Sequence, residues 1–245
     1  MIKQTSLDFL SNLKLNNSRE WFEQNKILYQ AYKDDIVQFT EQLLSELSII
    51  DLSIANANLI PKKCLTRVNR DLRFSKDKTP YKNYVLVVFN KNAPQPNTAG
   101  YFLHIEPGNC MIGGGVWQTS PEYLKKIRQE ISYSFDEING IISSKKFQDT
   151  FPSGIQGESK LKKFTDASEK REEVIELLKM KGFCTKELIS DKVLTSKDAI
   201  KTIMNYFETT KPLIDYYQKS GLYKQIDGSQ AMDTVYADVV ASLRV

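Results

Sequence analysis

The chain has 245 residues, of which 41% are hydrophobic and 26% charged, an ordinary globular balance that excludes a disordered protein. Its 34 lysines and arginines against 30 aspartates and glutamates leave a net charge of +4. The sequence contains no run of about 18 apolar residues, which a membrane span would need. Three scattered cysteines form no C-x-x-C pair and the amino terminus does not resemble a secretory signal, so we expect a cytoplasmic protein with no membrane partner.

The first 50 residues predict helices. Leucines three residues apart after Thr5 indicate a short helix, and a long helix is predicted from about 18 to 48. The long helix carries an apolar stripe made of Trp21, Leu28, Tyr32, Ile36, Phe39, Leu43 and Leu47. We interpret this stripe as core. The alternative is an aromatic ligand site made by Trp21, Tyr29 and Tyr32.

Alternating apolar and polar residues then predict a sheet. The expected strands are 65–74, 84–90, 101–106 and 110–117. The links KNAPQPNTAG and PGN are short and rich in turn residues, whereas a parallel crossover needs about a dozen residues or more. The sequence therefore predicts an antiparallel sheet of about four strands.

Helical periodicity returns after the sheet. Ser120 and Pro121 predict the start of a helix that runs to about 143, and 145–167 is predicted to be an irregular loop. Further helices are expected to begin at Ser168, near Ser196 and at Ser229, with a strand-like piece, FCTKELI, between the first two. No linker divides the chain, so we expect one α+β domain over residues 1–245: a helical region over 1–50, a sheet over 65–117 packed by the long helix, and a mainly helical region over 120–245.

The stretch RVNRDLRFSKDKTPYK, residues 67 to 82, holds six basic residues and two acidic ones, so its net charge of +4 equals that of the whole chain. On a strand over 65–74, Arg70 is the polar member of an apolar face, which predicts a structural arginine that is buried and held by a carboxylate or several carbonyls. Arg67, Asp71 and Arg73 share the opposite face, where the two guanidinium groups can hold an anion.

Lys78 and Tyr81 follow in a loop and are expected to reach back over this face, so the predicted ligand-binding residues are Arg67, Asp71, Arg73, Lys78 and Tyr81. The expected partner is a small molecule that bears a phosphate or carboxylate, bound as a substrate or as a signal. One alternative is a nucleic-acid patch with Phe74, Tyr81 and Tyr84 as stacking platforms. Another is an internal salt-bridge network with a purely structural role.

His104, the single histidine, shares a strand face with Glu106, two residues further on. The two residues are candidate catalytic groups, which could act as an acid–base pair or as two ligands of a metal site. The alternative is that the histidine is structural. Two ligands do not define a metal site, so no metal is predicted, and the sequence leaves any cofactor unknown.

Gly113, Gly114 and Gly115 precede the Pro121 helix. Glycine amides can approach an anion, but this run lacks the lysine and the spacing of a phosphate-binding loop. We therefore interpret it as a bulge or a close crossing of strands.

Three motifs, NNSREWFEQNK, RVNRDLRFSKDKTPYK and HIEPGNCMIGGGVW, resemble the bacterial family of unknown function called DUF2461. The resemblance extends from about Leu7 to Tyr217 and implies a bacterial protein of about 220 residues, without an activity to carry over. The chain departs from the family pattern around LKKFTDAS, and the tail after Gly221 lies outside the resemblance. Sequence alone thus names neither a reaction nor an oligomeric state.

Overall fold

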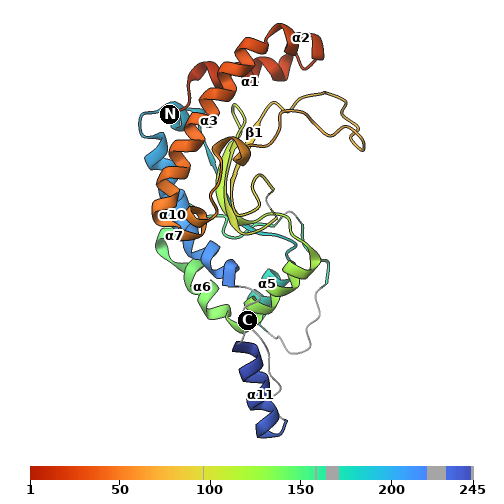
Figure 1. The fold of residues 1–245 in the computed structure, drawn as a ribbon, viewed down its shortest axis with the longest axis vertical. Coiled ribbons are helices and arrows are strands. Elements are labelled where there is room, and N and C mark those ends of the chain that lie inside the picture. The colour runs from red at the N-terminus through yellow and green to blue at the C-terminus, as the bar shows by residue number, and fades with distance from the viewer. Residues whose placement is uncertain (96, 158, 164–170, 220–229, 244–245) are drawn as a thin grey trace.

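The computed structural model describes residues 1–95, 97–157, 159–163, 171–219 and 230–243. Its central element is a four-stranded antiparallel sheet in the order β1-β2-β3-β4 (Figure 1). The strands are β1 (Val85–Phe89), β2 (Gly100–Ile105), β3 (Cys110–Val116) and β4 (Phe183–Ile189). The predicted α+β class, with an antiparallel sheet between N-terminal and C-terminal helices, is confirmed.

Helices lie before the sheet, between its third and fourth strands, and after it. Before it come α1 (Gln4–Leu15), α2 (Arg19–Gln24), α3 (Lys26–Ile50), α4 (Leu52–Asn56) and the 3-10 helix η1 (Pro61–Cys64). Between β3 and β4 come α5 (Pro121–Tyr133), α6 (Phe135–Ser143), α7 (Lys145–Thr150) and α8 (Glu172–Leu178). After β4 come α9 (Asp191–Thr195), α10 (Ala199–Lys219) and α11 (Met232–Leu243).

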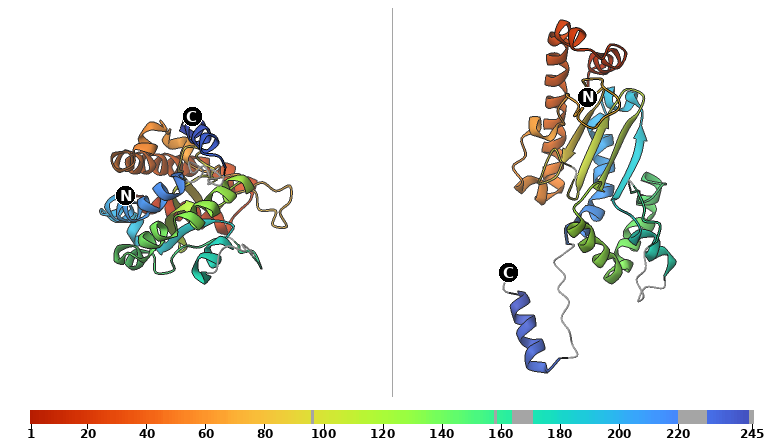
Figure 2. Two further views of the ribbon diagram at one scale, coloured as in Figure 1. Left: turned by 90° about the horizontal axis from the view of Figure 1, so that it is seen from below. Right: turned by 90° about the vertical axis from the view of Figure 1, so that its right-hand side faces the viewer.

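The core lies between one face of the sheet and α10, which runs behind the strands in the right-hand view of Figure 2. Alternate strand residues such as Val87, Tyr101 and Leu103 are fully buried on this face. The centre of the Tyr101 ring lies 5.2 Å from the centre of the Phe207 ring in α10. Leu86, His104 and Met111 pair across β1, β2 and β3 and occupy the opposite face.

The predicted strand over 65–74 does not form. Leu65 makes a single bridge to Val87, and Asn69 makes another to Tyr81. Beyond them the chain forms a loop in which Asp71 accepts a hydrogen bond from the backbone N–H of Arg73 and Asp77 accepts one from that of Thr79. Such local side-chain bonds compete with a strand ladder. The fourth strand is instead β4, the FCTKELI piece, which pairs with β3.

Two predicted helices are each divided in two. The helix expected over 18–48 is interrupted at Asn25, whose side-chain amide donates to the Trp21 carbonyl at 2.8 Å and so competes with the helical pattern. The helix expected over 120–143 is interrupted at Ser134, where the backbone leaves the helical region. The predicted starts at Ser168 and Ser229 lie outside the described residues. Of the helices that are described, none is long and apolar enough to cross a membrane.

Candidate functional site

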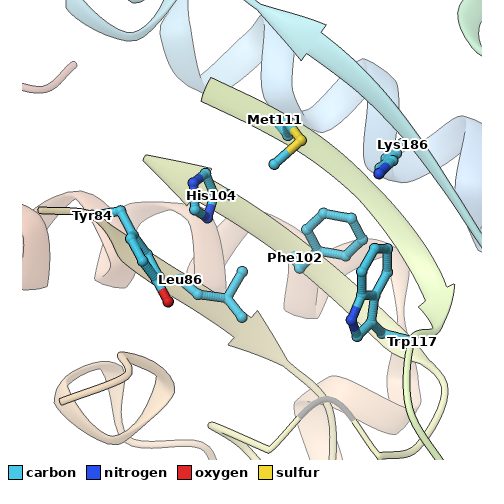
Figure 3. Close-up of a pocket in the computed structure, with 7 residues that line it drawn as sticks. All are labelled: Tyr84, Leu86, Phe102, His104, Met111, Trp117 and Lys186. Carbon is cyan, nitrogen blue, oxygen red and sulfur yellow. The ribbon is translucent and has the colours of Figure 1, made fainter. Parts of the chain in front are cut away.

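The open face of the sheet, opposite α10, contains a cavity of about 270 Å³ (Figure 3). Its lining side chains come from all four strands and the residues beside them: Tyr84, Leu86, Phe102, His104, Met111, Trp117 and Lys186. Phe102 and Lys186 both pair with Gly113, which lies between them in β3. Gly113 itself packs against the backbone of β4, because a Cβ atom added there would lie 1.9 Å from the Thr185 carbonyl oxygen. We call the cavity on this face of the sheet the open-face cavity.

His104 lies at one end of the open-face cavity. Its ring is 4.7 Å from the ring of Tyr84, and its Nε2 atom is 3.3 Å from Glu106 Oε2. Burial lowers the pKa of His104 below its usual value of 6.5, although Glu106 acts in the opposite direction. The imidazole is therefore mainly neutral at pH 7 and can accept a proton.

Glu106 orients this histidine and is itself well held. Burial alone would raise the pKa of Glu106, but hydrogen bonds from Asn109, His104 and Asn83 keep it below the usual value. The Asn83 and Asn109 amides donate to its two carboxylate oxygens at 2.9 and 3.0 Å. The two predicted catalytic residues thus form a partly buried pair that neighbouring amides hold in place. The exposed fraction of the side chain is 14% for His104 and 18% for Glu106.

A second cavity, of about 310 Å³, lies between α3 and the segment 62–69 that leads into the basic stretch. The charged side chains that line it are Lys33, Lys62 and Arg67, all of them cations. Ion pairs among the described residues involve none of the three. Tyr84 lines this cavity as well as the open-face cavity. We call it the Arg67 cavity.

Positive charge is concentrated beside the Arg67 cavity. Burial lowers the pKa of Lys82, and the nearby Arg67 guanidinium lowers it further. Lys33 contacts an aromatic wall of the cavity, with its Nζ atom 5.9 Å from the centre of the Tyr29 ring. An anion placed here would relieve the repulsion between cations.

The other predicted ligand-binding residues of the basic stretch do not line either cavity. Asp71 and Arg73 form a two-point ion pair in the outer loop, with N–O distances of 3.0 and 2.7 Å, and both are exposed. Lys78 donates to the Leu72 carbonyl. We call residues 71–79 the loop tip, which projects away from the sheet in Figure 1.

Arg70 and Tyr81 hold the base of this loop. Arg70 is half-buried rather than buried, and its guanidinium contacts Asp77 and Thr79. The face on which we expected Arg70 does not exist, because no strand forms there. Tyr81 stacks on Phe22 with ring centres 4.0 Å apart, which places it in the packing of the N-terminal helices.

The lining residues that the sequence analysis missed include three lysines, Lys33, Lys62 and Lys186, as well as Trp117 and the apolar residues of the open-face cavity. Lys33 lay inside a helix that we read as core packing, and Lys62 preceded the basic stretch. Lys186 lay in the FCTKELI piece, but its position opposite Gly113 depends on a pairing between distant segments. Among the described residues, no group of His, Cys, Asp or Glu side chains is arranged to hold a metal ion.

Comparison with known proteins identifies the family to which this chain belongs. Residues 5–216 match the model of the family described as conserved hypothetical protein (DUF2461), and the chain belongs to this family. No solved structure matches the chain.

Short stretches are also similar to nucleotide kinases. The chain is 42% identical over 60 residues to an adenylate kinase from Clostridioides difficile (strain 630), which is 24% of this chain and 28% of that kinase. It is 48% identical over 40 residues to a UMP-CMP kinase from Rattus norvegicus, covering 16% and 20% of the two chains. The chain therefore spans between a fifth and a third of the length of these curated kinases.

Proposed function

We propose that this protein binds a small molecule through a phosphate or carboxylate group in the Arg67 cavity. The observation that supports the proposal is the charge of the lining, where Lys33, Lys62 and Arg67 are accompanied by no acidic side chain. The guanidinium of Arg67 can bind two oxygens of an anion at once, and the lysines contribute point charges. Asn69 and Thr66, which also line the cavity, add polar groups for orientation.

An enzymatic role would use His104 and Glu106. A ligand bound at Arg67 lies beside Tyr84, which also lines the open-face cavity where His104 is located. A mainly neutral imidazole oriented by a carboxylate is suited to accept a proton from a substrate. In this proposal Glu106 stabilises the imidazolium ion that forms.

The binding proposal is tested by thermal unfolding with inorganic phosphate, citrate and nucleotides at two salt concentrations. Nucleotides belong in the panel because the short matches are to nucleotide kinases. A ligand at about 100 times its Kd stabilises the folded state by about 2.7 kcal/mol, or roughly 5–10 °C for a chain of this size. We expect Arg67→Gln to weaken binding about tenfold and to reduce this shift by about half.

Arg73→Gln is the matched control, because it removes the same charge from the loop tip and not from the cavity. Its ligand-induced shift should equal that of the unchanged protein. Loss of the shift in Arg73→Gln with retention in Arg67→Gln would move the anion to the loop tip and refute the cavity proposal.

Nucleic-acid binding by the loop tip is a second candidate, favoured by Phe74. Its side chain is 95% exposed, and the Arg73 guanidinium lies 6.0 Å from the ring centre. Single-stranded DNA would stack on this ring, and its affinity would fall steeply with salt. A salt-independent affinity, or no loss in Phe74→Ala, counts against this candidate.

A structural role for the basic stretch is the third candidate, and the pairs Arg73–Asp71 and Arg70–Asp77 favour it. It predicts that Arg73→Gln lowers the melting temperature without changing any ligand response. We further propose that the protein acts in the bacterial cytoplasm, where three unbridged and buried thiols would remain reduced.

A further inference from the structure

The open-face cavity is mainly apolar, although it lies on the face of the sheet opposite the core. Leu86, Phe102 and Met111 form its floor, and Tyr84 and Trp117 add aromatic walls (Figure 3). Concave sites with aromatic and aliphatic walls and few polar groups are typical of sites for small molecules. A volume of about 270 Å³ suits a ligand of one or two rings.

The polar groups of this cavity are at opposite ends. His104 lies beside Tyr84, and Lys186 lies beside Trp117 with its Nζ atom 5.0 Å from the ring centre (Figure 3). Within the described residues, no ion pair involves Lys186. The lining therefore carries a positive charge at the Trp117 end and no negative charge to balance it.

We propose that the open-face cavity binds an aromatic carboxylate, with its ring against Phe102 and Trp117 and its carboxylate at Lys186. Aromatic rings stack favourably at offset or edge-to-face angles, and a carboxylate close to a lysine gains a charge-assisted hydrogen bond. The ligand class follows from the combination of apolar walls with one unpaired cation. A neutral aromatic compound would leave Lys186 without an anionic partner.

This inference goes beyond the anion site at Arg67, because Arg67 does not line the open-face cavity and Lys186 does not line the Arg67 cavity. The two sites therefore depend on different cations. Each can be tested with the other left intact.

The experiment uses Trp117 as a reporter. The chain contains two tryptophans, and Trp21→Phe leaves Trp117 as the single one while it keeps a ring beside Phe9. The probes are 4-nitrobenzoate and 4-nitrobenzamide, which have similar shapes and quench tryptophan on contact but differ in charge. We expect saturable quenching by both, with the carboxylate bound about fivefold more tightly than the amide.

Substitution of the cation separates the possible causes. In Lys186→Gln the two probes should bind equally, whereas the exposed control Lys192→Gln and the second control Arg67→Gln should keep the fivefold difference. Calorimetric titration of the unchanged protein with the same two compounds supplies the affinities without any substitution. Far-ultraviolet circular dichroism verifies that each variant folds.

Three outcomes overturn the inference. The first is the absence of saturable quenching by 4-nitrobenzoate, which would mean that the cavity does not accept an aromatic ring. The second is equal affinity for acid and amide in the unchanged protein, which would make the site a neutral apolar pocket. The third is loss of the difference in Arg67→Gln and not in Lys186→Gln, which would place the carboxylate in the Arg67 cavity.

Discussion

Gly114 lies where β3 meets α10, and its replacement tests how closely the two elements approach. A Cβ atom added at this position would lie 2.5 Å from Thr210 Cγ2 in α10 and 3.0 Å from the Gly100 carbonyl oxygen. Two carbon atoms in ordinary contact are about 3.5–4.0 Å apart, so the overlap with the Thr210 methyl group is about 1 Å or more. Gly114→Ala therefore forces α10 away from the sheet.

The expected cost is at the upper end of the range for overpacking. Gly114→Ala should lower the free energy of unfolding by about 3 kcal/mol, equivalent to a melting temperature about 6–12 °C lower. Thr210→Ser removes the methyl group but keeps the hydroxyl that donates to the Tyr206 carbonyl, and it should cost about 1 kcal/mol.

If the overlap with Thr210 is the main cause, the double variant will cost much less than the sum of the two single ones. We expect about 2 kcal/mol for the pair against a sum of about 4, since a weaker contact with the Gly100 oxygen remains. Urea unfolding of the four proteins measures this coupling. Gly140→Ala is the matched control, because a Cβ atom there meets nothing within 4 Å at an exposed position of α6, and it should stabilise by about 0.5–1 kcal/mol. Additive costs for Gly114→Ala and Thr210→Ser would refute the proposed packing.

Three further predictions concern buried polar groups. Asp35→Ala should cost about 1–3 kcal/mol in urea unfolding, because it leaves the buried Ser6 hydroxyl without its acceptor at 2.6 Å, whereas Asp35→Asn keeps an acceptor and should cost less. Tyr101→Phe should cost about 1–2 kcal/mol at pH 7 and less at pH 3. Hydrogen bonds, including the one from Tyr101, lower the pKa of Asp51 despite its burial, and the stability that they contribute is lost as the carboxylate becomes protonated at low pH. An equal cost at both pH values contradicts this. The pKa of His104 is lowered by folding, so the unfolded chain binds the proton first and the protein loses stability as the pH falls below about 6.5. His104→Gln should reduce the difference between the urea midpoints measured at pH 7 and pH 5.5.

Local signals predicted most of the sheet. The ranges expected for β1, β2 and β3 agree with the structure within about one residue at most ends, because each strand alternates and short turns join them. The prediction for 65–74 was wrong although the same alternation was present. There the side chains of Asp71 and Asp77 bind nearby backbone N–H groups, and a pattern of polarity does not reveal that competition.

The candidate sites were less accessible to prediction, because they depend on contacts between distant segments. The clustering of charge indicated Arg67, Arg73 and Lys78 as ligand-binding residues. Of these, Arg73 and Lys78 lie in the loop tip, which projects away from the sheet. Lys33 and Lys62 come to Arg67 only through the packing of α3 beside the segment 62–69. Lys186 reaches the open-face cavity only because β4 pairs with β3 across more than 60 intervening residues. Such pairings have no local signature.

The three consecutive glycines of β3 permit neighbouring segments to pack closely against this strand. Gly114 faces α10 and permits its close approach, whereas Gly113 permits the close approach of β4, because a Cβ atom there would lie 1.9 Å from the Thr185 carbonyl oxygen. Gly115 has a φ of +119°, a conformation that other residues rarely adopt, and a Cβ atom there would lie 2.2 Å from the Phe183 carbonyl oxygen. The run is thus explained by close packing, as its lack of a phosphate-loop pattern suggested. The same run of glycines thus brings α10 close to one face of β3 and brings β4, which carries Lys186, close to its edge.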